Sequence, residues 1–164
     1  MRNLLLGALM MLMALPVAAQ RDYVTDMRDI GGKLVTVTQP WTRANSDVGR
    51  NAPVYFKVHN TTDMEDAIVG ATSPYAREVA VHQTRENALG VDVMQPVDGV
   101  TIPQGAKVAL KPGGFHLMMI GLQQPLKLGM EVPVKVEFKN SRAQYLRVQI
   151  LGPRSMGPDA APTH

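Results

Sequence analysis

The chain of 164 residues contains no cysteine, has only 5% aromatic residues and has no strong excess of either charge. The absence of cysteine excludes disulfides, thiolate nucleophiles and thiolate metal ligands. Lysine and arginine number 17 against 14 acidic residues, for a net charge of +3. Basic and aromatic residues do not cluster either, so the sequence lacks the electrostatic footprint of a nucleic-acid-binding protein. We therefore expect no nucleic-acid partner.

Long apolar runs are also missing, with one exception near the N-terminus. Residues 4–15 are apolar, Arg2 precedes them, and small residues at 16–19 lie just before Gln20. This run is too short to span a bilayer with ease, and its flanks are those of a secretory signal. We predict a cleaved signal peptide over residues 1–19, a periplasmic location and no stable membrane insertion after cleavage. An uncleaved membrane anchor is the less favoured alternative.

The rest of the chain shows apolar and polar residues alternating with period two. The alternation is clearest over residues 54–58, 132–138 and 146–150, and glycine, proline and asparagine separate the alternating segments. No window shows a long helical period. The pattern predicts an all-β sandwich or barrel of about seven to nine strands. Further strands are expected over residues 34–38, 67–71, 78–84, 91–97, 107–110 and 115–121.

This pattern gives one domain over residues 34–151, with different composition on either side. Residues 20–33 are polar and irregular. Residues 152–164 are rich in proline, glycine and alanine. We expect an irregular N-terminal segment and a flexible C-terminal tail, since chain ends without apolar anchors are poorly ordered.

Two histidines and two methionines are the candidate functional residues. His82, Met94, His116 and Met118 have the spacing His-x11-Met-x21-His-x-Met. Imidazole nitrogen and thioether sulfur form a borderline and soft ligand set, which suits Cu(I) better than Zn, Mg or Ca. In an oxidising compartment a thiol ligand would be at risk of disulfide formation, whereas histidine and methionine are not. The sequence therefore favours a Cu(I) site built from these four residues.

Strand geometry groups the four residues into two local pairs. His82 and Met94 lie symmetrically about residue 88, and residues 86–90 resemble the loop of an antiparallel hairpin. That register would place the two side by side, with Cα atoms about 4.5 to 5.5 Å apart. His116 and Met118 are two residues apart, so on a strand they share a face at a spacing of about 6.6 Å.

Each of these residues also has an ordinary structural interpretation. Methionine mostly fills hydrophobic cores, and a lone histidine on a strand is usually a surface residue, which is our interpretation of His59. The joint pattern favours a site, because Val79 and Val81 alternate inward while His82 faces the other way. The glycine-rich segment 111–114 lacks the Gly-Lys-Ser/Thr ending and the following helix of a phosphate-binding loop.

The four-residue spacing and its surroundings resemble the PCuAC-type periplasmic copper chaperones. The resemblance covers about residues 41–151 and includes the segments 54–56, 70–74, 112–118 and 126–129. It implies a cupredoxin-like Greek-key β-sandwich or barrel that binds Cu(I) through His82, Met94, His116 and Met118. The family's usual His-Met pair at the start of the motif is His82-Gln83 here. That departure leaves the four ligands intact but puts an auxiliary thioether contact in doubt.

The resemblance also implies a function and partners. A PCuAC chaperone helps to deliver Cu(I) to the dinuclear copper centre of cytochrome c oxidase, so we expect the oxidase's copper-binding subunit and a Sco-type thiol protein as partners. The ligand chemistry favours a carrier over an enzyme. A blue-copper site needs a cysteine, and a hydrolytic metal site keeps an open water position beside a general base.

Two other functions stay open at this point. The protein could sequester copper for resistance without a dedicated acceptor, or it could be a non-metal envelope interaction module with an incidental His/Met cluster. In the tail, Met156 and His164 could add weak Cu(II) binding, because imidazole and the terminal carboxylate suit the harder ion. An ordinary disordered end is the simpler interpretation of that segment.

Overall fold

The computed structural model describes residues 34–159, which form ten β-strands and no helix. The predicted signal peptide, residues 20–33 and His164 lie outside the described residues. Nothing between residues 34 and 159 is a helix of the length and apolar character needed to cross a membrane. The strands are β1 (Val35–Arg43), β2 (Ala52–Asn60), β3 (Asp66–Thr72), β4 (Ala76–Glu86), β5 (Asp92–Pro96), β6 (Val100–Ile102), β7 (Lys107–Leu110), β8 (Phe115–Leu122), β9 (Glu131–Phe138) and β10 (Gln144–Leu151).

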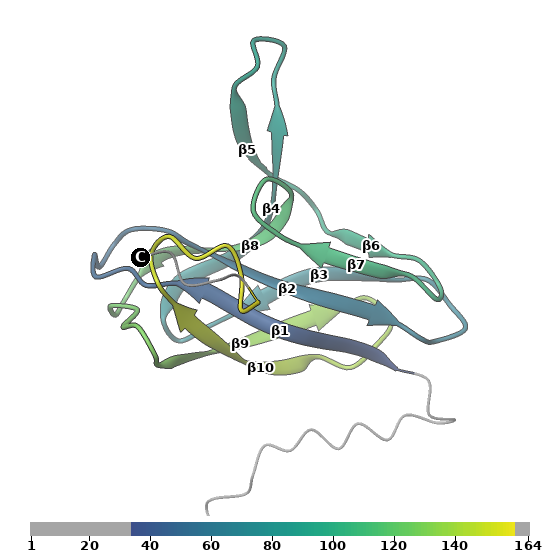
Figure 1. Cartoon of the computed structure of the whole chain (residues 1–164). Coiled ribbons are helices and arrows are strands. Elements are labelled where there is room, and N and C mark those ends of the chain that lie inside the picture. The colour runs from purple at the N-terminus through teal and green to yellow at the C-terminus, as the bar shows by residue number, and fades with distance from the viewer. Residues whose placement is uncertain (1–33, 160–164) are drawn as a thin grey trace, which may run out of the picture.

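Seven strands close into a ring, in the order β4, β8, β2, β1, β10, β9 and β3, with β3 pairing back to β4. The pairing of β1 with β10 is parallel, and the other pairings of the ring are antiparallel. Of the remaining strands, β5 pairs with β4, β6 pairs with β3 and β7 pairs with β2 (Figure 1). The predicted all-β, cupredoxin-like architecture is confirmed.

The core fills the inside of the ring. Val79 and Val81 of β4 belong to it, as predicted, so the residues at even positions of this strand face outward. Each fully buried valine, leucine or phenylalanine contributes about 1.5 to 3 kcal/mol through removal from water. The largest wholly buried apolar side chains include Phe56, Ile68, Ile102, Leu117, Met119, Leu122 and Leu126.

A β-bulge divides β1 between Thr38 and Trp41. Before the bulge Val37 pairs with Val58, and after it Trp41 pairs with Tyr55. Because a register shift of one residue exchanges the two faces of a strand, the bulge turns Trp41 outward. Gln39, within the bulge, has a φ of 52°, in the left-handed region.

The expected strand list differs from the structure in two places. The short strand β6 was not predicted, because three residues are too few to show alternation, and the total of ten exceeds the expected seven to nine. The strand expected over residues 34–38 continues to Arg43. Proline normally ends a strand, but the bulge accommodates Pro40 within β1.

One hairpin projects from the ring. The end of β4 and the whole of β5 rise above the other strands (Figure 1). Asn87 closes the turn. Its side-chain oxygen accepts hydrogen bonds from the backbone N–H groups of Leu89 and Val91, and its backbone N–H donates to the Val91 carbonyl. Gly90 supplies the positive φ of 75° that this turn needs. We call residues 84–94 the arm.

Candidate metal centre

His82 and His116 lie directly opposite each other on the neighbouring strands β4 and β8. Both face away from the core, and their ring centroids are 5.9 Å apart. The row of rings continues across β2 and β1, with Tyr55 at 6.1 Å from His116 and Trp41 at 4.7 Å from Tyr55. The Arg43 guanidinium lies 5.7 Å and 5.9 Å from the two aromatic centroids. The histidine pair is thus one end of a ring row on the outside of the barrel wall.

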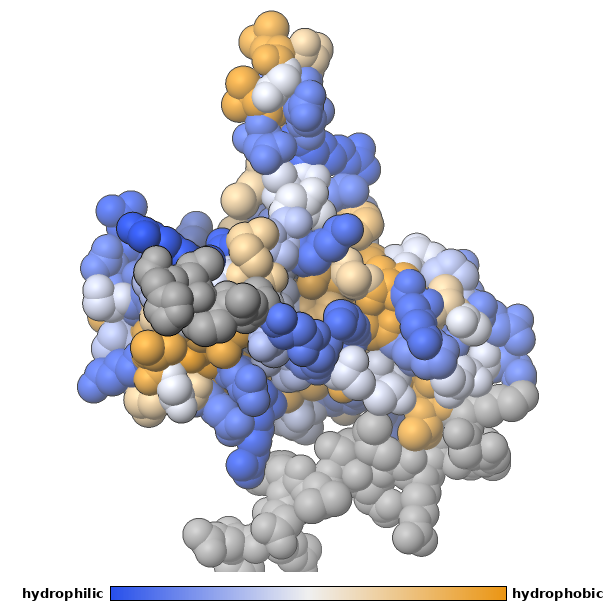
Figure 2. Space-filling view, viewed as in Figure 1, coloured by the Kyte–Doolittle hydropathy of each residue, from blue (hydrophilic) through white to orange (hydrophobic). Residues whose placement is uncertain are grey.

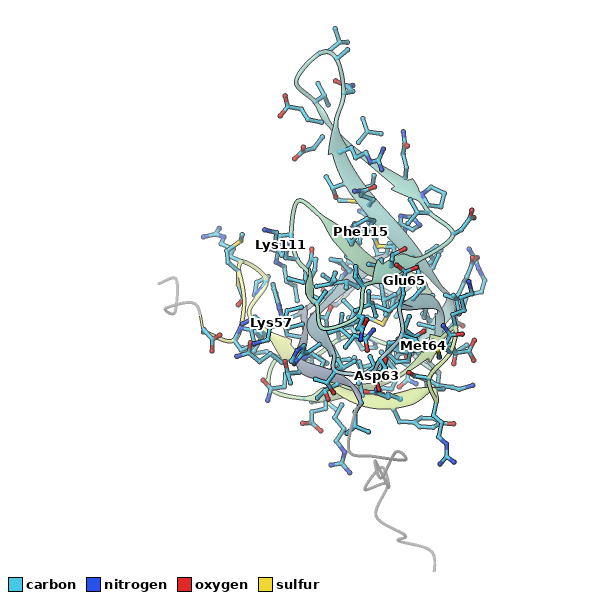
Figure 3. All side chains as sticks on the ribbon, turned by 90° about the vertical axis from the view of Figure 1, so that its right-hand side faces the viewer. Lys57, Asp63, Met64, Glu65, Lys111 and Phe115 are labelled. Carbon is cyan, nitrogen blue, oxygen red and sulfur yellow. The ribbon has the colours of Figure 1, made fainter. Side chains whose placement is uncertain are left out.

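A tight bend before β8 fixes the position of His116. The Lys111 N–H donates to the Phe115 carbonyl and the Gly114 N–H donates to the Lys111 carbonyl, so the chain turns sharply at the foot of the arm (Figure 3). Gly113 has a φ of 77°, which other residues rarely adopt. The Gly114 carbonyl then accepts the N–H of Thr84 at 3.0 Å, which ties the bend to the arm.

The hydrogen bond of His116 leaves its second ring nitrogen free. Nδ1 lies 3.1 Å from the Gly114 carbonyl oxygen. A carbonyl only accepts, so Nδ1 carries the proton and the lone pair is on Nε2. Nε2 of His116 and Nδ1 of His82 are both buried, and neither has a hydrogen-bond partner within residues 34–159. Buried nitrogens without partners cost stability. The unprotonated nitrogen of a neutral imidazole, as at Nε2 of His116, is the atom that can ligate a metal.

The surroundings favour the neutral form of His116. Burial lowers the pKa of its imidazole below the ordinary 6.5, the Gly114 carbonyl raises this pKa in part, and the nearby His82 lowers it further. Burial also raises the pKa of Tyr55 above 10.0, while the Arg43 charge opposes this. The phenol is therefore uncharged at neutral pH and adds no anion to the centre.

The two methionines flank the histidine pair on the same face. The outward-facing residues along β4 are Ala80, His82 and Thr84. Met118 of β8 pairs with Ala80, and Met94 of β5 pairs with Thr84. Met118 is 7% exposed, whereas Met94 is 57% exposed. The structure therefore places all four predicted residues on one face, with a buried thioether on one side and an exposed thioether on the other.

The predicted direct pairing of His82 with Met94 is wrong. His82 pairs with Pro96, and the hairpin is centred on residue 89 because Asn87 and Gly90 define a turn closed by Glu86 and Asp92. A shift of two residues keeps Met94 on the same face. It becomes a diagonal neighbour of His82 at about 7 to 8 Å, instead of a partner at about 5 Å.

Gln83 and His59 lie away from the centre. Gln83 pairs with Phe115 and so points to the opposite face of β4, where its side chain accepts a hydrogen bond from Arg85. A methionine at this position would also face away, so the departure from the family pattern removes no ligand from this face. His59 lies further along β2, opposite Lys107.

The donor set is soft and uncharged. Within residues 34–159, no three side chains from histidine, cysteine, aspartate and glutamate come close enough to hold a metal ion. Met118 and Met94 flank the histidine pair on this face, and thioether ligands would favour Cu(I) over hard divalent ions. The sequence did not indicate that Tyr55 and Trp41 continue the row of rings beside His116. The bulge that turns Trp41 outward has no clear sequence signal.

Residues 152–159 lie against β1 and β2. Arg43 donates to the Ser155 carbonyl at 2.8 Å and to the Met156 sulfur at 3.4 Å. Asp159 accepts hydrogen bonds from Gln39 and lies 3.8 Å from the Lys57 ammonium, which Figure 3 labels. The flexibility of residues 152–164 and their weak Cu(II) binding stay predictions.

Comparisons with known sequences match most of the described domain. The family model described as "LpqE-like: Putative lipoprotein LpqE-like" matches residues 35–150. A "Putative lipoprotein" of Leifsonia xyli subsp. xyli is 32% identical over 117 residues, which are 71% of this chain and 69% of that protein. An "Uncharacterized protein" of Rickettsia prowazekii is 29% identical over 120 residues and is matched over 66% of its length, just under two thirds.

Two solved structures with the same architecture contain copper. The copper-bound PCuAC domain of PmoF2 has a TM-score of 0.62 at 22% identity, covering 73% of this chain and 93% of that domain. The Cu(I)-bound solution structure of DR1885 from Deinococcus radiodurans has a TM-score of 0.61 at 26% identity, covering 76% and 83%. The first likeness shows the fold alone.

Proposed function

The chain belongs to the LpqE-like family over residues 35–150 and has the PCuAC fold, and from this we propose that it is an extracytoplasmic copper chaperone. It binds one Cu(I) through His82, Met94, His116 and Met118. The observation that carries the proposal is the pair of buried ring nitrogens without partners, on histidines that face each other across β4 and β8. The copper-bound states of PmoF2 and DR1885 support it.

The ligand set favours release as well as binding. All four ligands are neutral, so the positive charge of Cu(I) stays uncompensated and a thiolate from an acceptor binds it more strongly. Met94 is 57% exposed, whereas Met118 is 7% exposed and His116 is 1% exposed. An incoming thiolate therefore replaces Met94 first: the copper bond to its sulfur breaks as the bond to the thiolate forms, and copper remains Cu(I) throughout.

The proposed destination is the dinuclear copper centre of cytochrome c oxidase. The partners are then the copper-binding subunit of the oxidase and a Sco-type thiol protein, and the protein works in the periplasm as a carrier without catalytic activity. This destination is the one that the resemblance of the four-residue motif to PCuAC chaperones implies. Copper sequestration is the competing function, and normal loading of the oxidase in cells that lack this protein would favour it.

Titration of the mature chain with Cu(I) under anaerobic conditions, against a competing chelator, tests the binding step. We expect one tightly held Cu(I) per chain, and a large loss of affinity in His82→Gln and in His116→Gln. His59→Gln is the matched control, because His59 lies outside the ring row and should leave affinity unchanged. A chain that retains no copper would support the non-metal envelope module, and equal losses in all three variants would refute this ligand set.

A further inference from the structure

The face that carries the metal centre continues onto the arm. Beyond Thr84 and Met94, the next outward residues on β4 and β5 are Glu86 and Asp92, which pair directly with each other. Two carboxylates therefore lie one step past the exposed methionine, on the same side of the sheet. They are the first charged pair beyond the metal centre in this direction along the arm.

No positively charged side chain within residues 34–159 forms an ion pair with either carboxylate. Carboxylates directly opposite each other destabilise an antiparallel pair. No hydrogen bond or ion pair joins Glu86 or Asp92 to another side chain in the part of the chain that the structure describes. The adjacent Arg85 points to the opposite face, where it donates to Gln83 at 2.6 Å.

The tip of the arm is apolar, and hydrogen bonds hold its backbone turn. Leu89 is 85% exposed and Val91 is 54% exposed, and Figure 2 shows this apolar tip above a hydrophilic band. The backbone N–H groups of Leu89 and Val91 donate hydrogen bonds to Oδ1 of Asn87, at 2.9 Å and 3.0 Å. A preformed apolar tip loses little conformational entropy on binding, so it is suited to insertion into a hollow on another protein.

We propose that the outward face and tip of the arm form the docking surface for the copper acceptor, and that this acceptor is a protein with lysine or arginine side chains around a thiol ligand. This inference rests on the proposed function. Glu86 and Asp92 attract the basic rim, Leu89 and Val91 insert beside it, and docking places the acceptor's thiol over Met94. A protein fits this surface better than an anionic lipid membrane, because the paired carboxylates would be repelled by lipid phosphates.

Transfer kinetics to defined thiol peptides test the electrostatic part. Two peptides of equal length carry one cysteine each, flanked by lysines in one and by glutamates in the other. At low salt, Cu(I)-loaded mature protein should transfer copper to the lysine peptide at least tenfold faster, and the ratio should fall as salt rises. Equal rates to the two peptides at low salt would overturn the proposal.

The double variant Glu86→Gln with Asp92→Asn should remove this preference. Its Cu(I) affinity should stay within about twofold of the wild type, since neither carboxylate is a proposed ligand. The matched control is Asp47→Asn with Glu131→Gln, which changes the net charge equally but lies off the arm, and it should keep the preference. A preference that survives in the arm variant, or an arm variant that changes only Cu(I) affinity, would contradict the docking role.

The apolar tip is tested with a folded acceptor, the purified copper-binding domain of the oxidase subunit. Leu89→Ser with Val91→Ser should raise the acceptor concentration for half-maximal transfer about tenfold, with unchanged circular dichroism. Loss of binding to anionic vesicles in this variant, without any change in transfer, would assign the tip to a membrane instead. Failure of the proposed function is seen separately, because the wild-type chain would then hold no Cu(I) before any acceptor is added.

Discussion

At the scale of single residues, the two methionines of the proposed metal centre differ strongly in burial. Met118→Leu nearly conserves volume, so we expect the fold to persist while Cu(I) affinity falls at least tenfold, or about 1.4 kcal/mol. Met94→Leu should lose less affinity, because Met94 is 57% exposed, and should give up its copper to a chelator faster than the wild type. Chelator competition measures both changes. An unchanged affinity in Met118→Leu would remove this residue from the site.

His116 should make the metal-free protein sensitive to mild acid. Burial, as the main cause, lowers its folded-state pKa below the ordinary 6.5. The unfolded chain therefore binds more protons as the pH falls below about 6.5, so the free energy of unfolding decreases in that direction. Urea midpoints at pH 7 and pH 5 should differ more for the wild type than for His116→Gln. An equal decrease in both proteins would mean that His116 does not cause the acid sensitivity.

Asp66 is a buried carboxylate with a structural role far from the metal centre. Burial raises its pKa, but hydrogen bonds from Ser141, Asn140 and Ala67 outweigh this and lower the pKa below 3.8. Its stabilisation is thus complete above pH 3.8 and is lost as the pH falls through the folded-state pKa. Asp66→Asn should cost about 1 to 3 kcal/mol at pH 7, measured by urea unfolding, with unchanged Cu(I) affinity. A cost that does not shrink as the pH is lowered below 3.8 would show another cause.

At the scale of elements, the bulge in β1 is the feature that turns Trp41 toward the ring row. Gln39 has a φ of 52°, which costs a residue other than glycine about 1 kcal/mol. Gln39→Gly should therefore be neutral or stabilising, whereas Gln39→Val should destabilise by at least that amount, because a branched Cβ is worst in this region. Both variants lose the hydrogen bond to Asp159, so their difference in thermal unfolding isolates the backbone. No difference would place the strain elsewhere.

The strands differ in how well the sequence predicts them. Alternation is a local property, so it identified β2, β9 and β10, where one face packs on the core. The register of a hairpin is set by its turn. Centring the β4–β5 hairpin on residue 88 ignored the turn that Asn87 and Gly90 form, so the predicted register was wrong by two residues. The extension of β1 was missed because a bulge depends on its neighbouring strands.

At the scale of the whole molecule, the pairing of β8 with β4 brings the residues of the candidate site together. The sequence predicted that His116 and Met118 share a face, and the structure agrees. It did not predict that β8 would lie beside β4, which places His116 opposite His82, because strand order depends on contacts distant in sequence. The soft donor set was predictable from residue types alone, whereas the burial of its nitrogens and the projection of the arm required the fold.

The measurement that tests the copper site most directly is the X-ray absorption spectrum of the mature chain loaded with one Cu(I). Two imidazoles and two thioethers predict a first shell that contains both nitrogen and sulfur. Met94→Leu with Met118→Leu should remove the sulfur scattering and leave the nitrogen scattering from the histidine pair. A first shell of nitrogen and oxygen alone in the wild-type protein would contradict the proposed ligand set.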